Sequence, residues 1–231
     1  KRILLELGGK DPLIVLDDAD VAAAAQHAAR GSFRNAGQVC VSTERIYVHS
    51  SVADEFERLL VEQVPSFVVG NGVDAETVVG PMINEKQAEH VRRQVADALA
   101  SGARVLAGGD MGEGTFVHPT VLGDLDHSMD IMRTETFGPI ACVVRVEDAE
   151  QAIQLANDSK YALGAVVFGR DEERAARVAH RLHAGMTGIN RGVGGASGSP
   201  WVGARESGYG YHGGKAGQRQ FAQARIVSRS R

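Results

Sequence analysis

The chain has 231 residues, and its 43% hydrophobic content is enough for a substantial core in one large domain or two small ones. Its formal net charge of −4 gives no basic excess, so neither nucleic acid nor an anionic membrane surface is an expected partner. The longest apolar runs are too short to span a bilayer, and the opening "KRILLELGGK" lacks the layout of a signal peptide, so we expect a cytoplasmic protein.

The two cysteines, Cys40 and Cys142, lie far apart in the sequence and in unlike contexts. This arrangement predicts reduced thiols rather than a disulfide framework or a zinc knuckle. The eight histidines show no metal-ligand spacing, so no metal site is expected. Because the chain starts without methionine and runs directly into a strand-like segment, we expect it to be a fragment of a larger protein.

Helical and strand-like segments alternate from the first residues onward. The opening "RILLEL" predicts a strand, and Asp17 or Asp18 is a suitable N-cap for an alanine-rich helix that stops at Gly31. The segment "ERIYVHS" then alternates like a half-buried strand. A helix with apolar residues at helical spacing follows it until Pro65.

The middle of the chain continues this alternation. Asn84, with Gln87 three residues later, has the pattern of a capping box ahead of a helix that Gly102 closes. The later strand and helix candidates are, in order, "ARVLAGG", "PIACVVRV", "EDAEQAIQLAN", "ALGAVVFG", "DEERAARVAHRLHAG" and "MTGIN". Strand–helix–strand passages of this kind imply parallel pairing, so the predicted fold class is α/β.

After Asn190 the sequence becomes rich in glycine and serine and carries the only tryptophan, Trp201. We predict a long loop there, and a tryptophan inside such a loop favours a functional role over disorder. The chain then ends with a predicted helical turn and a strand in "FAQARIVSRS".

Cys40 is the first candidate for chemistry. A cysteine attacks only as its thiolate, so a nucleophilic cysteine needs surroundings that lower its pKa, commonly a helix N-terminus or a cluster of backbone N–H groups. The stretch "NAGQVC" offers a glycine turn just before the thiol, and a helix or strand could begin in "VSTER". The alternative is that Cys40, between Val39 and Val41, is a small buried hydrophobe, and the local sequence alone favours this alternative.

Two acidic positions are further candidates. Glu6, flanked by leucines on a strand, either points to solvent or acts as a base in an apolar setting that raises its pKa. Gly8 and Gly9 after it permit a sharp turn and a close approach of the backbone to a ligand. In "TETFGP", Glu135 and Phe137 are either a solvated acid and a core residue, or an acid and an aromatic face suited to a ribose diol and a planar ring.

Four segments together carry a resemblance. "LELGGK" (5–10), "FRNAGQVC" (33–40), "ETFGPI" (135–140) and "NDSKYALGAVVFGRD" (157–171) resemble, in this order, the catalytic-half signatures of the NAD(P)-dependent aldehyde dehydrogenase superfamily. The resemblance implies an open, mostly parallel sheet flanked by helices, of the aldehyde dehydrogenase catalytic-domain type. It further implies a catalytic domain over residues 1–205 and a C-terminal tail, 206–231, with an oligomerisation strand.

The resemblance also implies a covalent mechanism. In that superfamily, the thiolate at the position of Cys40 attacks the aldehyde carbonyl, and the thiohemiacetal loses a hydride to NAD or NADP and becomes a thioester. The glutamate at the position of Glu6 activates the water that hydrolyses this thioester. The residues implied in cofactor binding are Glu135, which would hold the nicotinamide ribose, Phe137, Leu7 and Gly8, and those implied in the aldehyde pocket are Val39, Val41 and Trp201.

Superfamily members carry a Rossmann-like domain before "LELGGK", and this chain contains none of its residues. The resemblance therefore implies a catalytic domain that is inactive or slow by itself, a small-molecule aldehyde as substrate, and a dimeric or tetrameric homo-oligomer. The aldehyde could be aromatic or aliphatic, or a semialdehyde if Arg34 or Arg191 points inward. Two other functions stay open, namely a cofactor-independent thiol esterase or acyl transferase, and a non-catalytic assembly fragment.

Overall fold

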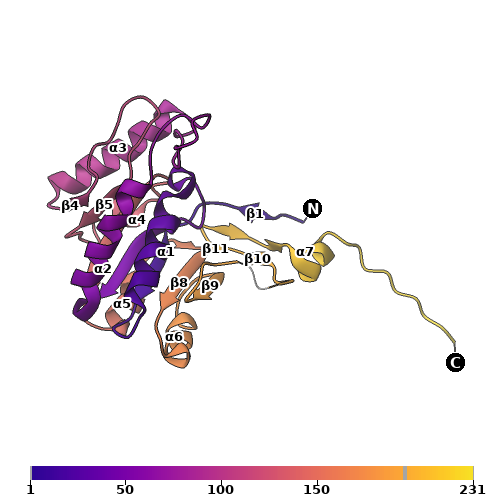
Figure 1. Ribbon diagram of the computed structural model, residues 1–231. Helices are drawn as coiled ribbons and strands as arrows, with labels where there is room; N and C mark the ends of the chain where they lie inside the picture. Colours follow the sequence, from indigo (N-terminus) through magenta and orange to yellow (C-terminus); the bar gives the residue numbers. More distant parts are fainter. Residues whose placement is uncertain (1, 195–196, 231) are drawn as a thin grey trace.

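The computed structural model describes residues 2–194 and 197–230. A seven-stranded sheet forms its centre, with strands β2 (Asp11–Val15), β3 (Thr43–His49), β4 (Arg104–Ala107), β5 (Thr120–Gly123), β6 (Ile140–Val146), β8 (Gly164–Phe168) and β9 (Met186–Ile189). The strand order is β4-β5-β6-β3-β2-β8-β9, and every neighbouring pair is parallel except β4 with β5 (Figure 1). The predicted α/β class with a mostly parallel sheet is confirmed.

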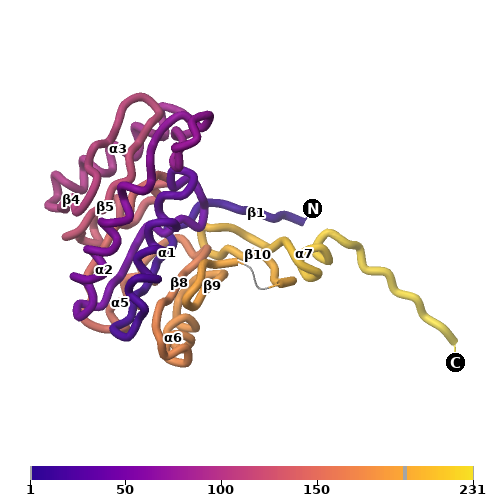
Figure 2. Tube along the Cα trace, viewed as in Figure 1, coloured from indigo at the N-terminus to yellow at the C-terminus, as the bar shows by residue number. Residues whose placement is uncertain are grey.

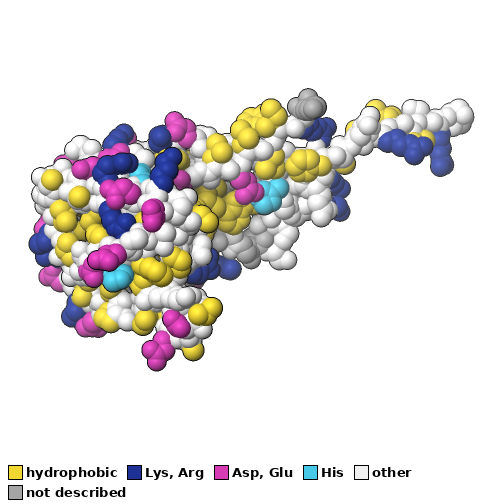
Figure 3. All heavy atoms as spheres, turned by 90° about the horizontal axis from the view of Figure 1, so that it is seen from above, with side chains coloured by type: hydrophobic (Ala, Val, Ile, Leu, Met, Phe, Trp, Pro, Cys, Tyr) yellow, Lys and Arg dark blue, Asp and Glu magenta, His cyan; other side chains and the backbone are white. Residues whose placement is uncertain are grey.

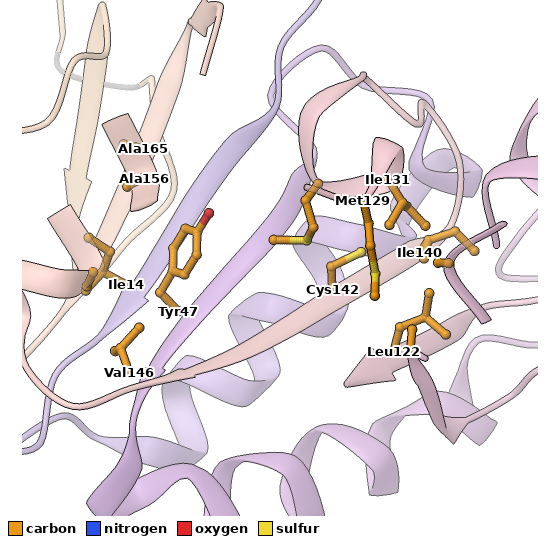
Figure 4. Packing of buried hydrophobic residues seen from close by; sticks show 14 of the residues in the cluster. Ile14, Tyr47, Leu122, Met129, Ile131, Ile140, Cys142, Val146, Ala156 and Ala165 are labelled. Carbon is orange, nitrogen blue, oxygen red and sulfur yellow. The ribbon is translucent and has the colours of Figure 1, made fainter. Parts of the chain in front are cut away.

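Helices cover both faces of this sheet (Figure 1). They are α1 (Val21–Phe33), α2 (Ser50–Gln63), α3 (Glu85–Ala100), the short α4 (Asp130–Arg133), α5 (Ala149–Asn157) and α6 (Glu172–Ala179). Since successive side chains of a strand point to opposite faces, each buried strand feeds two cores. Leu13 packs in the core under α1 and α2, whereas Ile14, Tyr47 and Cys142 pack in the core under α3, α5 and α6 (Figure 4).

Two central strands differ from their predictions. The sequence analysis assigned no strand to β2, whose Pro12 lacks the backbone N–H that a central strand normally uses. The structure places Pro12 near the start of β2, where the pairing with β3 shifts register. β3 is buried along its length rather than half-buried, with only His49 partly exposed, because it lies in the middle of the sheet.

The helix ends are partly as expected. The N-cap of α1 is Asp20, whose side chain accepts from the N–H of Ala23, so the assignment to Asp17 or Asp18 was wrong. α1 also runs past Gly31 to Phe33. The N-cap of α3 is Asn84, as predicted, and its side chain accepts a hydrogen bond from the backbone N–H of Gln87.

Short strands and a helix build an arm that projects from the body. In it, β1 (Leu5–Glu6) pairs with β12 (Gly208–Tyr209), and β10 (Trp201–Val202) pairs with β13 (Tyr211–His212), which leads to α7 (Gly214–Gln220). At its base, β11 (Ala204–Arg205) pairs with β7 (Tyr161–Ala162). Both chain ends lie on this side of the body (Figure 2).

The arm corrects three predictions. The opening strand is shorter than "RILLEL", and the long loop predicted after Asn190 contains β10 to β13 and α7. The strand predicted near the C-terminus is not formed, since residues 222–230 have no regular structure. A strand needs a neighbouring strand to pair with, and no strand in the described part of the chain pairs with this tail.

Candidate functional site

Three loops meet at the edge of the sheet where the parallel strands begin. They are residues 7–10 before β2, 35–41 before β3 and 134–139 before β6. Together with α3 they line a cavity of about 380 Å³, here called the thiol cavity, whose lining residues are Leu7, Gly8, Cys40, Gln87, His90, Glu135 and Phe137. The structure thus brings Cys40 together with every residue that was predicted to bind the cofactor.

A left-handed turn presents Cys40 to the thiol cavity. Asn35, Ala36 and Gly37 have φ angles of 54°, 54° and 68°, a conformation that side chains rarely adopt. A side chain at Gly37 would collide with the carbonyl group of Gly138. Glycine at this position therefore lets the turn pack directly against the loop 134–139.

The surroundings of the thiol do not activate it. Burial raises the pKa of Cys40, the charge of Asp11 raises it further, and that of Glu6 adds to the effect. The backbone N–H groups of Val41 and Cys40 act in the opposite direction. The element that follows Cys40 is the strand β3, one of the two possibilities that the sequence left open, so no helix N-terminus lies directly after the thiol.

A buried ion pair connects the loop 7–10 and the loop 134–139 with strand β3. Lys10 Nζ lies 2.5 Å from Glu44 Oε2, and both side chains are almost completely excluded from solvent. Lys10 Nζ also donates to Thr136 Oγ1 at 2.9 Å. Glu44 in turn accepts from the backbone N–H groups of Thr136, at 2.8 Å, and Phe137, at 2.9 Å. We call this network the Lys10–Glu44 clamp.

The clamp fixes the residues predicted for the cofactor. Phe137 has a φ of 48°, which is unusual for a bulky residue, and its N–H is held by the Glu44 carboxylate. Glu135 Oε1 accepts from the N–H of Gly9 at 2.8 Å, and a side chain at Gly8 would collide with the Glu135 carboxylate. Burial raises the pKa of Glu135, and the Gly9 N–H partly opposes that shift.

Helix α3 adds two residues that the sequence patterns did not reveal as part of a site. Gln87 Nε2 donates to the carbonyl oxygens of Thr136, at 3.0 Å, and Phe137, at 3.2 Å. His90 Nε2 lies 3.1 Å from the carbonyl oxygen of Glu135. The capping box identified Gln87 only as a helix-start residue, whereas its side chain holds the neighbouring loop.

Glu6 lies outside the thiol cavity. It stands on β1 in the arm with its side chain about half exposed, and its carboxylate contacts His212 Nε2 on β13. It is nevertheless close enough to Cys40 for its charge to raise the pKa of the thiol. No local pattern pointed to His212, because the two strands that bring it to Glu6 are far apart in the sequence.

The neighbours of Cys40 face a different space. Val39 and Val41 line a second cavity of about 450 Å³, here called the arginine cavity, together with Arg30 of α1 and Arg34, the residue that follows this helix. Trp201, predicted for the same pocket, is not among the described residues that line it. Its ring lies instead against Gly194, which brings the indole to the base of the arm.

Asp11 is a buried carboxyl in the wall of the arginine cavity. Its Oδ1 accepts from the N–H of Gly164 at 3.0 Å, while its buried Oδ2 has no hydrogen-bond partner among the described residues. Burial raises the pKa of Asp11 to about 8, although the Gly164 N–H and the Arg45 charge oppose the shift. Burial therefore favours the protonated form of Asp11.

The second cysteine is inert by comparison. Cys142 is fully buried, and burial raises its pKa to about 12. Within residues 2–194 and 197–230, no cluster of three or more His, Cys, Asp or Glu side chains is placed to hold a metal ion. The helices in this part of the chain also lack the length and apolarity needed to cross a membrane.

We expect Glu44→Gln to lower the free energy of unfolding by about 3 to 5 kcal/mol, because Lys10 would stay buried without a counter-charge. Urea denaturation followed by circular dichroism measures the change. The double variant Lys10→Met with Glu44→Gln leaves no unpaired buried charge and should recover much of the loss. A loss below about 1 kcal/mol in the single variant would mean that the clamp does not hold the loops.

Asp11→Asn should change how stability depends on pH. The folded-state pKa of about 8 lies above the ordinary value of 3.8, so the Asp11 contribution to stability is complete below pH 3.8 and declines until pH 8. Since the variant lacks this decline, its free energy of unfolding should rise relative to wild type over that interval, by a few kcal/mol. Urea denaturation at a series of pH values measures this difference. If the free energy of unfolding depends on pH in the same way in both proteins, Asp11 is not buried and protonated.

Alkylation should separate the two cysteines and test the effect of Glu6. Native protein treated with iodoacetamide should be modified at Cys40 and not at Cys142, as intact-mass spectrometry before and after Cys40→Ala would show. Glu6→Gln should speed alkylation of Cys40 at a fixed pH near 8, because it removes a negative charge that raises the thiol pKa. An unchanged or lower rate would mean that Glu6 does not act on the thiol.

Comparison with known proteins agrees with this geometry. The family model of the aldehyde dehydrogenase family matches residues 1–227. Vanillin dehydrogenase of Pseudomonas fluorescens is 44% identical over 99% of this chain and 47% of its own length. The NADP-dependent succinate-semialdehyde dehydrogenase of Deinococcus radiodurans is 42% identical over 98% of this chain and 48% of its own length.

The fold comparison gives the same result. The crystal structure of betaine aldehyde dehydrogenase from Staphylococcus aureus with NAD+ superposes with a TM-score of 0.90 and 40% identity, over 96% of this chain and 45% of that chain. An indole-3-acetaldehyde dehydrogenase with NAD+ superposes with a TM-score of 0.91 and 35% identity, over 96% of this chain and 46% of that chain. The chain thus spans about half the length of the relatives that it matches. Its sequence and its fold both assign it to the aldehyde dehydrogenase family.

Proposed function

We propose that this chain carries the catalytic residues for oxidation of an aldehyde to a carboxylic acid with NAD or NADP. The observation that supports it most is the thiol cavity, where Cys40 lies with Glu135 and Phe137. The relatives named above are all aldehyde dehydrogenases, which favours the same reaction. Because the chain spans about half of them, the activity is proposed for the assembled enzyme rather than for this chain alone.

In the proposed reaction Cys40 is the nucleophile. Its thiolate forms a bond to the carbonyl carbon of the aldehyde, and after loss of hydride from that carbon the acyl group remains on sulfur as a thioester. Water then attacks the thioester carbonyl, the carboxylic acid leaves and the thiol is restored. The backbone N–H groups of Cys40 and Val41, which favour negative charge at the thiolate, are the proposed donors to the carbonyl oxygen as well.

Glu6 is the proposed base for the hydrolytic step. It takes a proton from the attacking water, which requires a carboxylate near the thioester. Its influence on the pKa of Cys40 supports this proximity. The contact with His212 gives the exposed carboxylate a fixed neighbour across β1 and β13.

The thiol cavity fits the nicotinamide end of the cofactor. Leu7 and Phe137 offer apolar surface to a planar ring, Gly8 allows close approach, and the half-buried Glu135 keeps one carboxylate oxygen free of any hydrogen bond within the described residues. When bound, NAD or NADP supplies the acceptor for the hydride. We propose that the rest of the cofactor is bound by residues outside this chain, since the GxGxxG spacing of Gly208, Gly210 and Gly213 lies in the antiparallel arm and not between a strand and a helix of the parallel sheet.

A chimera tests the function. This chain would replace the matching half of Pseudomonas fluorescens vanillin dehydrogenase, and formation of reduced cofactor would be followed with vanillin and simple aldehydes. We expect Cys40→Ala to abolish the signal, and Glu6→Gln to keep a single-turnover burst followed by slow turnover, because hydride loss precedes hydrolysis.

Two results would contradict the proposal. One is aldehyde oxidation by the chimera that survives Cys40→Ala. The other is rapid Cys40-dependent cleavage of an activated ester with no reduced cofactor formed from any aldehyde, which would favour a thiol esterase instead.

We further propose a cytoplasmic homo-oligomer, dimer or tetramer, built on a catalytic domain (1–205) and a tail (206–231). A working Cys40 must stay reduced, which favours the cytoplasm. Hydrophobic side chains gather on the arm (Figure 3), and Leu5, Tyr209, Ile226 and Val227 are exposed. Deleting residues 222–231 should shift the protein to a smaller species in size-exclusion chromatography, and an unchanged elution would contradict a role for the tail.

A further inference from the structure

One glutamine joins the turn before the thiol to the segment that precedes helix α3. Gln38 ends the left-handed turn, here called the thiol turn (35–38), and lies two residues before Cys40. Its side-chain oxygen Oε1 accepts a hydrogen bond from the backbone N–H of Ile83 at 2.8 Å. The proposed reaction leaves this side chain without a role.

The thiol turn needs support from outside. Asn35 and Ala36 have positive φ angles, which cost free energy for residues other than glycine, so the turn persists only where its surroundings hold it. Ala36 is buried in the core, and Gly37 packs directly against Gly138. The Asn35 side chain donates to the carbonyl oxygen of Gln38 at 2.9 Å. The bond between Gln38 and the segment before α3 thus adds a further support to a strained turn.

The segment that Gln38 contacts is itself held in place. Met82 is buried in the core, and its backbone N–H donates to the carbonyl oxygen of Thr115 at 2.8 Å. Asn84 caps α3. Between them, the side chain of Ile83 is 77% exposed, so this residue contributes its backbone N–H rather than packing. Gln38 therefore ties the thiol turn to a fixed part of the body.

These contacts close a ring around the thiol cavity. α3 begins directly after the segment that Gln38 contacts, and side chains of α3 hold the loop 134–139. That loop returns to the thiol turn, where Gly138 meets Gly37. The wall that carries Cys40 is thus joined to the wall predicted to bind the cofactor at two places. One is the contact between the two glycines, and the other is the hydrogen bond of Gln38.

We propose that Gln38 is a positioning residue for Cys40, because its hydrogen bond to Ile83 fixes the turn that presents the thiol to the thiol cavity. The backbone N–H groups of Cys40 and Val41 favour the thiolate, and they need a fixed orientation to do so. Gln38 acts through this backbone and takes no part in the bond-making steps. The inference rests on the proposed function where it concerns aldehyde oxidation, whereas the effect on the thiol is measured without an aldehyde.

The pH dependence of Cys40 alkylation tests the proposal on the purified chain. Rates of modification by iodoacetamide are measured over a range of pH for wild type and Gln38→Leu, with intact-mass spectrometry as the readout. A looser turn that merely admits the reagent would change the limiting rate at high pH. A turn that no longer orients its N–H groups moves the midpoint of the profile instead, and we expect an upward shift of about half a pH unit. An unmoved or lower midpoint would overturn the proposal.

Two further variants test the partner and the specificity of the effect. Ile83→Pro removes the N–H that donates to Gln38 and should move the midpoint upward, and the double variant with Gln38→Leu should move it no further. Gln63→Leu is the matched control, because it removes a half-buried glutamine at the end of α2, which does not line the thiol cavity. A shift in Gln63→Leu, or additive shifts in the double variant, would count against the proposed bond.

The chimera separates this inference from the proposed function. There, Gln38→Leu should lower kcat by about threefold and leave KM near its wild-type value, because the thiol loses its orientation while the binding surface stays. A shifted alkylation midpoint, with aldehyde oxidation that survives Cys40→Ala, would support the role of Gln38 and contradict the proposed function. Cys40-dependent oxidation, with kcat and the alkylation midpoint both unchanged by Gln38→Leu, would support the function and overturn the inference.

Discussion

The site depends on one buried ion pair. Removing Lys10 and Glu44 from water is costly, and the cost is offset only because their charged atoms find further partners in Thr136 and Phe137. These bonds tie the segment before β2 to β3 and to the loop before β6. Without them, nothing in the backbone of Phe137 would favour its left-handed conformation. The shape of the thiol cavity thus depends on the bonds that the buried charges of Lys10 and Glu44 make.

The location of the site in the sheet accounts for the raised pKa of the Cys40 thiol. Ligands of parallel sheets usually bind at the carboxyl ends of the strands, where helices begin, but here the loops precede their strands. Helices end at this edge, and Arg45 donates to the last carbonyl groups of α5 at Leu155 and Ala156. Negative helix ends give a thiolate no support, which agrees with the raised pKa of Cys40.

The sequence predicted the members of the site better than their connections. The motifs identified Cys40 together with Leu7, Gly8, Glu135 and Phe137, and these residues meet in one cavity. The sequence could not reveal the contact between Glu6 and His212 or the hydrogen bonds that Glu44 accepts, because such pairs join segments far apart in the chain. Most elements followed from hydrophobic periodicity and caps, whereas the fully buried β2, which contains Pro12, was not predicted.

The turn at Cys40 sends successive side chains into different spaces. Val39 and Val41 line the arginine cavity, and Cys40 lines the thiol cavity. A substitution at either valine therefore reshapes one cavity while leaving the walls of the other intact. In evolutionary terms, substrate range and cofactor binding can therefore change independently. Substitutions at Val39 or Val41 can alter which substrates are accepted without altering the surface that faces the cofactor.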